Sequence, residues 1–262
     1  MKVIAFTRPQ NRLESSISLA EGMGFKTVTA PSLQILPVEE GSLVRFSKLL
    51  LSKRYDCLIF TSATAVDKVF NFFDGDLDYV SQMNRMEIIA IGLPTSIKLQ
   101  ENGIEGIAIP DIYTSEGLLQ DFGKHLIMKN VCLLRSDKGT SVLKKGLESL
   151  GANVDEVFVY RLEAAPISDE LRFLVDSAIR GVIDAFVFTS ALSVKAFFDN
   201  ALKIADEKAV RMFLSDSFVA AIGKPTWERL VSNGIRVDLV PSKADFEIML
   251  KEIKHHFETL DK

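Results

Sequence analysis

The sequence contains few of the residues that most often bind metals or carry redox chemistry. Its 262 residues include two cysteines and three histidines. Cys57 and Cys132 lie inside apolar segments without C-x-x-C spacing, so we interpret them as buried thiols in a reducing compartment. His255 and His256 are adjacent, and adjacent residues on a helix do not face a common point. The sequence therefore predicts no metal site.

The sequence also lacks features that would direct the chain to a membrane or to nucleic acid. No apolar run approaches the length of a membrane span, and Met1 and Lys2 lead into a strand pattern without a signal peptide. The formal net charge of −4 provides no basic surface for nucleic acid. We therefore expect a cytoplasmic protein with neither a membrane nor a nucleic-acid partner.

Four common functional motifs are absent as well. The sequence contains no G-x-x-x-x-G-K-[ST], no G-x-G-x-x-G after a strand, no G-x-S-x-G and no H-E-x-x-H. These absences argue against nucleotide, hydride-transfer, serine-nucleophile and zinc-hydrolase chemistry.

An internal repeat is the strongest positive signal. The segment DCLIFTSATAV at 56–66 returns as DAFVFTSALSV at 184–194. In both copies an apolar run ends in Thr-Ser and a helical pattern follows, which predicts a buried parallel strand. Thr61-Ser62 and Thr189-Ser190 should therefore lie at the carboxyl end of such a strand, where open α/β sheets bind ligands.

The repeat extends over the whole chain as two alternating segments, A and B, in the order A-B-A-B. In A, Arg8 matches Arg135, and in B, Gly92 matches Gly223. Each A predicts two strands and each B predicts three. One A and one B would therefore form a five-stranded, doubly wound parallel α/β sheet. The polar segment 74–85, inside the first B, is predicted to be a loop.

Two pairings of these segments are possible. Neighbours could pair as 1–128 and 129–262, or the first A could pair with the last B around an inserted domain. Two proline-containing segments, at 34–40 and 161–167, look like extended connectors. We therefore favour a discontinuous domain of 1–33 and 168–262, an inserted domain of 41–160, and a two-strand connector between them.

Several strand-to-helix turns carry hydroxyl groups at the predicted ligand edge. Hydroxyls at helix N-caps, with the free N–H groups that follow them, bind carboxylates or phosphates without a charged side chain. Each turn taken alone is an ordinary N-cap, but several at the edges of two sheets favour a cleft for a ligand with several anionic groups. The candidate hydroxyls are those of Thr61, Ser62, Thr95, Ser115, Thr189, Ser190 and Thr226.

Three cationic residues and one tyrosine complete the candidate site. Arg8 and Arg135 end the first strand of each A and either face the ligand or are simply solvated; Lys224 lies in the last Gly-x-Pro turn. Tyr160 ends the last strand of A and adjoins a connector, so its phenol is the candidate acid between the domains.

Together these segments resemble the uroporphyrinogen-III synthase family over essentially the whole chain. The resemblance rests on the A-B-A-B order, two FTS-A-x-[SA]-V and two IG-x-PT segments, YTSEGLL at 113–119 and VDEVFVYR at 154–161. It implies two flavodoxin-like or Rossmann-like α/β domains joined by two strands, with the active site in the cleft between them. Lys224 departs from the family pattern, which often has a small residue or proline there.

The resemblance also implies a reaction. Linear hydroxymethylbilane loses its terminal hydroxyl and closes to uroporphyrinogen III, with ring D inverted through a spirocyclic pyrrolenine and without a cofactor. The family's conserved tyrosine falls on Tyr160, and its hydroxyl positions fall on Ser62, Thr95, Ser190 and Thr226. Hydroxymethylbilane is a small polycarboxylate, which suits a cleft of helix starts and backbone donors. We expect a monomer.

Two other functions are compatible with parts of the sequence. A non-catalytic two-domain binding protein for a small polyanionic ligand would share the fold, but such proteins usually carry an export signal or an output domain. A sugar-phosphate transferase would need an acidic metal-binding pair after a strand, and the sequence contains none.

Overall fold

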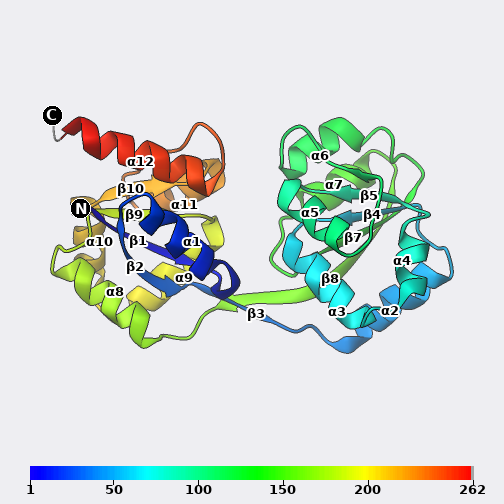
Figure 1. The fold of residues 1–262 in the computed structure, drawn as a ribbon, viewed down its shortest axis with the longest axis horizontal. Coiled ribbons are helices and arrows are strands. Elements are labelled where there is room, and N and C mark those ends of the chain that lie inside the picture. Colours follow the sequence, from blue (N-terminus) through cyan, green and yellow to red (C-terminus); the bar gives the residue numbers. More distant parts are fainter. Residues whose placement is uncertain (261–262) are drawn as a thin grey trace. The chain divides into compact units, whose positions relative to one another are not determined.

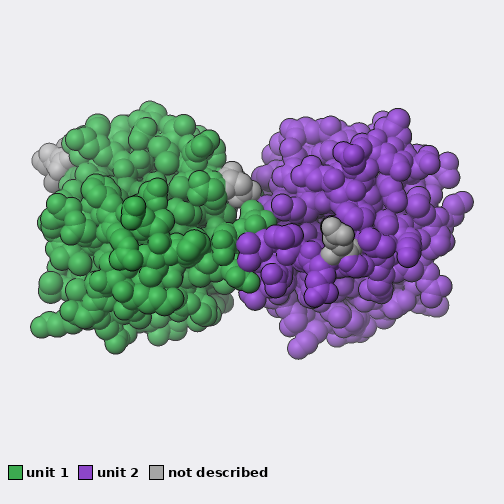
Figure 2. All heavy atoms as spheres, turned by 90° about the horizontal axis from the view of Figure 1, so that it is seen from below, with its two compact units in different colours: residues 1–35, 163–262 green, residues 36–162 purple. Residues whose placement is uncertain are grey.

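The chain folds into two compact units. The computed structural model describes residues 1–260. Unit 1 comprises Met1–Ile35 together with Glu163–Lys262, and unit 2 comprises Leu36–Leu162 (Figure 2). Each unit contains a sheet whose central strands pair in parallel, so both belong to the α/β class that the sequence predicts.

Unit 1 is built on a four-stranded parallel sheet in the order β10-β9-β1-β2 (Figure 1). Its strands are β1 (Val3–Arg8), β2 (Lys26–Pro31), β9 (Ala185–Phe188) and β10 (Phe218–Ala221). Its helices are α1 (Gln10–Gly22), α8 (Asp169–Ile179), α9 (Ala191–Ala201), α10 (Glu207–Asp216), α11 (Lys224–Ser232) and α12 (Phe246–Leu260).

Helices cover both faces of this sheet, which is why its strands are apolar on both sides. Ile4 and Phe6 face α1 and α12, whereas Ala5 faces the opposite layer, which α8 to α11 form. Phe6 packs edge-on against Phe246 of α12, with 5.5 Å between the ring centroids. Alternate residues of one strand thus enter two separate cores.

The fifth strand predicted for this sheet is almost absent. Leu239 makes a single parallel bridge with Ala220. The Asp238 carboxylate accepts the N–H of Val219 at 2.9 Å, so a side chain replaces part of the backbone ladder. The strand predicted at 237–239 has the right position. Because a carboxylate takes the place of a backbone acceptor there, the strand is reduced to one bridge.

Unit 2 is built on a six-stranded sheet in the order β3-β8-β7-β4-β5-β6, although residues 33–35 of β3 and 163–164 of β8 fall within unit 1. Its strands are β3 (Leu33–Leu36), β4 (Cys57–Phe60), β5 (Glu87–Ala90), β6 (Ile107–Ala108), β7 (Asn130–Ser136) and β8 (Asn153–Ala164). Its helices are α2 (Glu40–Leu51), α3 (Ala63–Phe73), α4 (Leu77–Met83), α5 (Leu93–Glu101), α6 (Ser115–Phe122) and α7 (Val142–Ser149).

Three details of unit 2 differ from the prediction. The segment 74–85, predicted as a loop, contains α4: Asp76 caps this helix, and the Tyr79 ring stacks on Phe73 with centroids 3.9 Å apart. β8 continues through Ala164, so Tyr160 lies inside the strand and not at its end. β3 adds a sixth strand beside β8, because the predicted connector segment 34–40 begins within a strand.

Both sheets reverse their strand order at one position. In unit 1 the order reverses between β1 and β9, and in unit 2 it reverses between β7 and β4. Ligands of doubly wound sheets bind at the carboxyl ends of the strands at this point. None of the helices within residues 1–260 combines the length and apolarity of a membrane-spanning segment.

Candidate functional site

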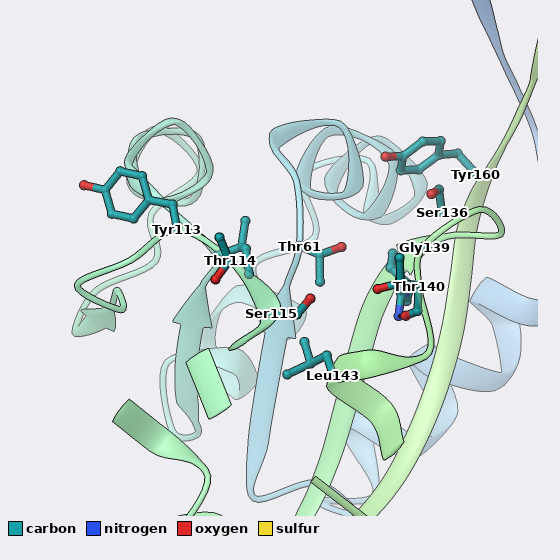
Figure 3. A pocket seen from close by; sticks show the side chains of 11 residues that line it. Thr61, Tyr113, Thr114, Ser115, Ser136, Gly139, Thr140, Leu143 and Tyr160 are labelled. Carbon is teal, nitrogen blue, oxygen red and sulfur yellow. Dashed lines mark hydrogen bonds between the residues drawn. The ribbon is translucent and has the colours of Figure 1, made fainter. Parts of the chain in front are cut away.

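A polar pocket opens at the strand reversal of unit 2. It has a volume of about 320 Å³ and lies beyond the carboxyl ends of β4, β5 and β7. In the view of Figure 3, Thr61 lies between Thr114 on one side and Thr140 on the other, with Ser115 below it. The polar groups lining it come from Thr61, Tyr113, Thr114, Ser115, Arg135, Ser136, Thr140 and Tyr160.

The Thr61-Ser62 turn forms one wall because the buried strand β4 ends there. Ser62 caps α3 as the sequence predicts, and its Oγ accepts the N–H of Ala65 at 3.0 Å. Thr61 Oγ1 donates to the carbonyl of Leu134 at 3.3 Å. Ser62 accepts the N–H of the third residue of α3, so the N–H groups of the first two residues have no partner within the helix. The positive end of the helix dipole lies beside these two groups.

Tyr160 reaches the same turn from β8. Its side chain is buried, and its phenol oxygen lies 3.1 Å from Ser62 Oγ. The register between β7 and β8 shifts at this point, from Arg135 opposite Phe158 to Ser136 opposite Tyr160. Such a bulge changes the direction of the side chains that follow it. The catalytic role of Tyr160 stays a prediction; its strand continues beyond it, to Ala164.

Arg135 is buried and largely engaged by the protein itself. It is 5% exposed, and Nη1 donates to the carbonyl of Thr140 at 2.8 Å and to Glu156 Oε1 at 3.3 Å. Its guanidinium lies against Gly139, where an added Cβ would be 1.4 Å from Nη2. We expected Arg135 either to face the ligand or to be solvated. It lines the pocket, but its main contacts order the loop at 136–140.

A second helix start contributes to the pocket at 113–117. Thr114 caps α6, and its hydroxyl accepts the N–H of Gly117 at 3.0 Å. Ser115 is the first helical residue and also lines the pocket. Tyr113 packs on Gly92, where an added Cβ would be 3.0 Å from the ring, and its ring points away from the other labelled side chains (Figure 3).

Thr95 and Thr226 occupy matching positions in the two units but are not helix caps. Gly92 and Gly223 are the N-caps of α5 and α11, and each helix has proline in its first turn. Thr95 is 3% exposed and Thr226 is 2% exposed, because both side chains turn into the protein. Their contact with a ligand stays a prediction.

The carboxyl edge of unit 1 repeats the Thr-Ser turn. Ser190 caps α9 as predicted, and its Oγ accepts the N–H of Ser193 at 3.0 Å, with Thr189 directly before it. Lys224, the first residue of α11, has a side chain that is 82% exposed. Its ammonium lies 3.9 Å from Glu228, an exposed pair that contributes little.

Arg8 ends β1 in unit 1 and is the repeat partner of Arg135. Nη1 donates to Ser16 Oγ at 2.7 Å, and the guanidinium lies 4.4 Å from the centre of the Phe246 ring. Burial, reinforced by Arg12 and opposed by Asp245, lowers the pKa of Arg8 to about 10. Arg8 therefore remains a cation at neutral pH in a partly desolvated position.

The chemistry available at these edges is anion binding and proton donation. Within the residues that the structure describes, no group of three or more His, Cys, Asp and Glu side chains could hold a metal ion. The pocket instead offers hydroxyls, the starts of α3, α6 and α7, and one buried guanidinium. Carboxylates are natural ligands for such a set.

A comparison with protein-family models identifies the family. The model described as uroporphyrinogen-III synthase HemD matches residues 15–251. The chain belongs to the uroporphyrinogen-III synthase family. The resemblance predicted from the sequence is thereby confirmed.

Relatives of the uroporphyrinogen-III synthase family match along most of their length. A provisionally named uroporphyrinogen-III synthase of Methanothermobacter thermautotrophicus is 30% identical over 88% of this chain and 90% of its own. The uroporphyrinogen-III synthase of Chlorobaculum parvum is 26% identical over 97% of this chain and 98% of its own. The crystal structure of a mutant uroporphyrinogen III synthase from Thermus thermophilus is 22% identical, with a TM-score of 0.67 over 99% of this chain and 100% of that chain. This last similarity supports the predicted two-domain α/β fold.

Sequence reasoning missed part of this family member's pocket. It noted the turn at 113–117 but selected only Ser115 from it, and it did not select Ser136, Gly139 or Thr140. A signal was present at 136–140, where SDKGT directly follows a predicted strand and contains a glycine. The wrapping of that loop around Arg135 is a tertiary contact, and no local pattern predicts it.

Proposed function

We propose that this chain is a uroporphyrinogen-III synthase. It converts hydroxymethylbilane to uroporphyrinogen III and water, closing the macrocycle with ring D inverted through a spirocyclic pyrrolenine; the reaction makes it a hydro-lyase. The observation that carries the proposal is the family match over 15–251. The hydroxyl-lined pocket at the strand reversal of unit 2 supports it further.

We assign substrate binding to the carboxyl edges of both sheets. Hydroxymethylbilane carries eight carboxylates, and helix starts with hydroxyl groups bind carboxylates without a metal. Arg8 and Arg135 add fixed positive charge, and Lys224 adds a mobile one. Thr95 and Thr226 remain proposed binding residues, and because both are buried they also shape their turns. The remaining proposed binding residues are Thr61, Ser62, Ser115, Thr189 and Ser190.

The catalytic task is mainly positioning. The linear substrate closes unaided to the uninverted ring, so the enzyme must hold its two ends in the geometry that leads to the inverted one. Tyr160 is the proposed proton donor to the departing hydroxyl, and its contact with Ser62 Oγ at 3.1 Å orients the phenol. No step of this scheme requires a cofactor.

The deciding experiment supplies hydroxymethylbilane to the purified protein and identifies the isomer formed after oxidation to the porphyrin. We expect type III with enzyme and type I in a reaction without enzyme. Type I alone in both reactions would refute catalysis, and tight binding of hydroxymethylbilane without turnover would favour a binding protein. We further propose that the protein is a cytoplasmic monomer, and light scattering after size exclusion tests its mass. The net charge of −4 supports the absence of a nucleic-acid partner.

A further inference from the structure

A chain of three serine hydroxyls, two of them buried, joins the Thr-Ser turn of unit 1 to the residue that precedes β3. Ser190 Oγ donates to Ser193 Oγ at 2.8 Å, and Ser32 Oγ donates to the same Ser193 oxygen at 3.2 Å. Ser193 is fully buried and Ser32 is 3% exposed. One hydroxyl therefore accepts from both sides, and a hydroxyl oxygen has two lone pairs for this purpose.

Ser32 occupies a defined place in the fold. It lies between β2 and β3, three residues before the boundary of unit 1 at Ile35. Its N–H donates to the carbonyl of Arg8 at 3.1 Å, and its carbonyl accepts the N–H of Ala165 at 3.0 Å. Ser32 thus connects the end of β1 with both stretches of chain that run between the units.

Helix α9 holds the second of these stretches as well. Asn200, on the last turn of α9, donates to the carbonyl of Ala165 at 2.7 Å and is 5% exposed. The helix that begins at the proposed binding turn therefore contacts both connecting stretches, through Ser193 at its start and Asn200 at its end. Networks of buried hydrogen bonds of this kind couple the groups that they join.

The repeat in unit 2 makes an equivalent link with different residues. Ala65 occupies the position that matches Ser193, and the cap Ser62 contacts Tyr160 on β8 instead. Tyr160 lies two residues before Leu162, the last residue of unit 2. Each Thr-Ser turn is thus tied to a residue close to a crossing of the chain between units. Ala65 also shows that alanine fits this helical position without loss of the cap.

We propose that Ser193 is a positioning residue for the reaction. Its hydroxyl fixes the Ser190 side chain and joins the turn at 189–190 to Ser32, so that the shape of the turn depends on the placement of the connecting chain. The N–H groups at the start of α9 are then held ready for a substrate carboxylate. This inference rests on the proposed function, because it assigns substrate binding to that turn.

The test is a set of serine-to-alanine variants measured by steady-state kinetics with hydroxymethylbilane. In the wild-type background, the effects of Ser190→Ala and Ser32→Ala on KM should be non-additive by about three- to tenfold, the size of one net hydrogen bond. In a Ser193→Ala background the two effects should multiply independently to within about twofold. Loss of folded protein lowers the apparent kcat but leaves KM unchanged, so KM is the informative quantity.

A matched control separates this role from general stability. Ser177 on α8 is 2% exposed and lies outside the hydroxyl chain, so Ser177→Ala should leave KM unchanged within about twofold. Independent effects of Ser190→Ala and Ser32→Ala in the wild-type background would overturn the proposal. If Ser193→Ala does not fold, the comparison of Ser190→Ala, Ser32→Ala and the double variant in the wild-type background decides by itself.

A second readout is independent of catalysis. Amide hydrogen exchange should become faster at 189–192 and at 32–33 in Ser193→Ala, and not in Ser177→Ala. Unchanged exchange at both places would overturn the coupling. A wild-type protein that forms no type III isomer would refute the proposed function, whereas a type III producer without coupling would refute only the role of Ser193.

Discussion

Replacing Gly139 with alanine tests the structure of the pocket most directly. An ideal Cβ at this position would lie 1.4 Å from Nη2 and 2.1 Å from Cζ of Arg135, far inside the closest approach of real Cβ atoms. Gly139 is not among the glycines with positive φ, so its backbone accepts alanine. The substitution therefore acts only by displacing the guanidinium.

The expected cost follows from what Arg135 loses. Its side chain is 6% exposed and that of Glu156 is 18% exposed, and moving the guanidinium breaks its bonds to Glu156 and to the carbonyl of Thr140. Breaking a buried ion pair costs about 3–5 kcal/mol. Lys144 remains 3.9 Å from Glu156 and offsets part of this cost. We therefore expect Gly139→Ala to lower the free energy of unfolding by about 2–3 kcal/mol.

Urea unfolding followed by circular dichroism measures this change, and the chain provides a matched control. Gly41 in α2 has open space around an added Cβ, so Gly41→Ala should stabilise slightly, by up to about 1 kcal/mol. In an Arg135→Met background the clash is gone, and Gly139→Ala should cost less than about 0.5 kcal/mol. An equal cost in both backgrounds would show that the guanidinium is not what the methyl group displaces.

Three further predictions concern the reacting group, the cation of unit 1 and the reduced fifth strand. Tyr160→Phe should lower kcat/KM on the order of 10²-fold without abolishing turnover, because one proton donor contributes about 10² to 10⁴ and water can replace it; full activity in the isomer assay would remove Tyr160 from the mechanism. Arg8→Met should raise KM yet leave the melting temperature unchanged or higher. Below about pH 10 the folded state bears the whole desolvation penalty of the Arg8 charge, and methionine keeps the contact with the Phe246 ring. A large fall in the melting temperature would contradict this. Asp238→Ala should lower the free energy of unfolding by about 1–2 kcal/mol in urea titrations, since it leaves the Val219 N–H without its acceptor, and an unchanged midpoint would show that water replaces the carboxylate.

Much of the fold was predictable because the repeat carries the information locally. An apolar run of strand length, followed by Thr-Ser and a helical pattern, specifies a buried parallel strand and a helix cap wherever it occurs. Ser62 and Ser190 therefore cap α3 and α9 as expected. The same local logic identified the carboxyl edge, and the pocket of unit 2 lies there.

The remaining features depend on contacts between distant residues. The short helix α4 lies in a segment, 74–85, that is largely polar in sequence, and it is held by the stacking of Tyr79 on Phe73. The burial of Arg135 depends on Glu156 from the neighbouring strand and on a loop that wraps the guanidinium. The bulge that directs Tyr160 is a property of the register between two strands. Periodicity and turn chemistry describe one segment at a time and contain none of these relations.

The interrupted sequence of unit 1 has a consequence for how the protein is made. During translation, residues 36–162 can pair strands β4 to β8 as soon as they leave the ribosome. Strand β1 must wait for β9, whose Ala185 lies opposite Ile4. Until then the edge of β1 that pairs with β9 keeps unpaired backbone N–H and C=O groups, which are open to unwanted association. Chaperones should therefore be needed mainly for the amino-terminal strands, although these are synthesised first. A chain that terminates before β9 should leave these strands without their partner.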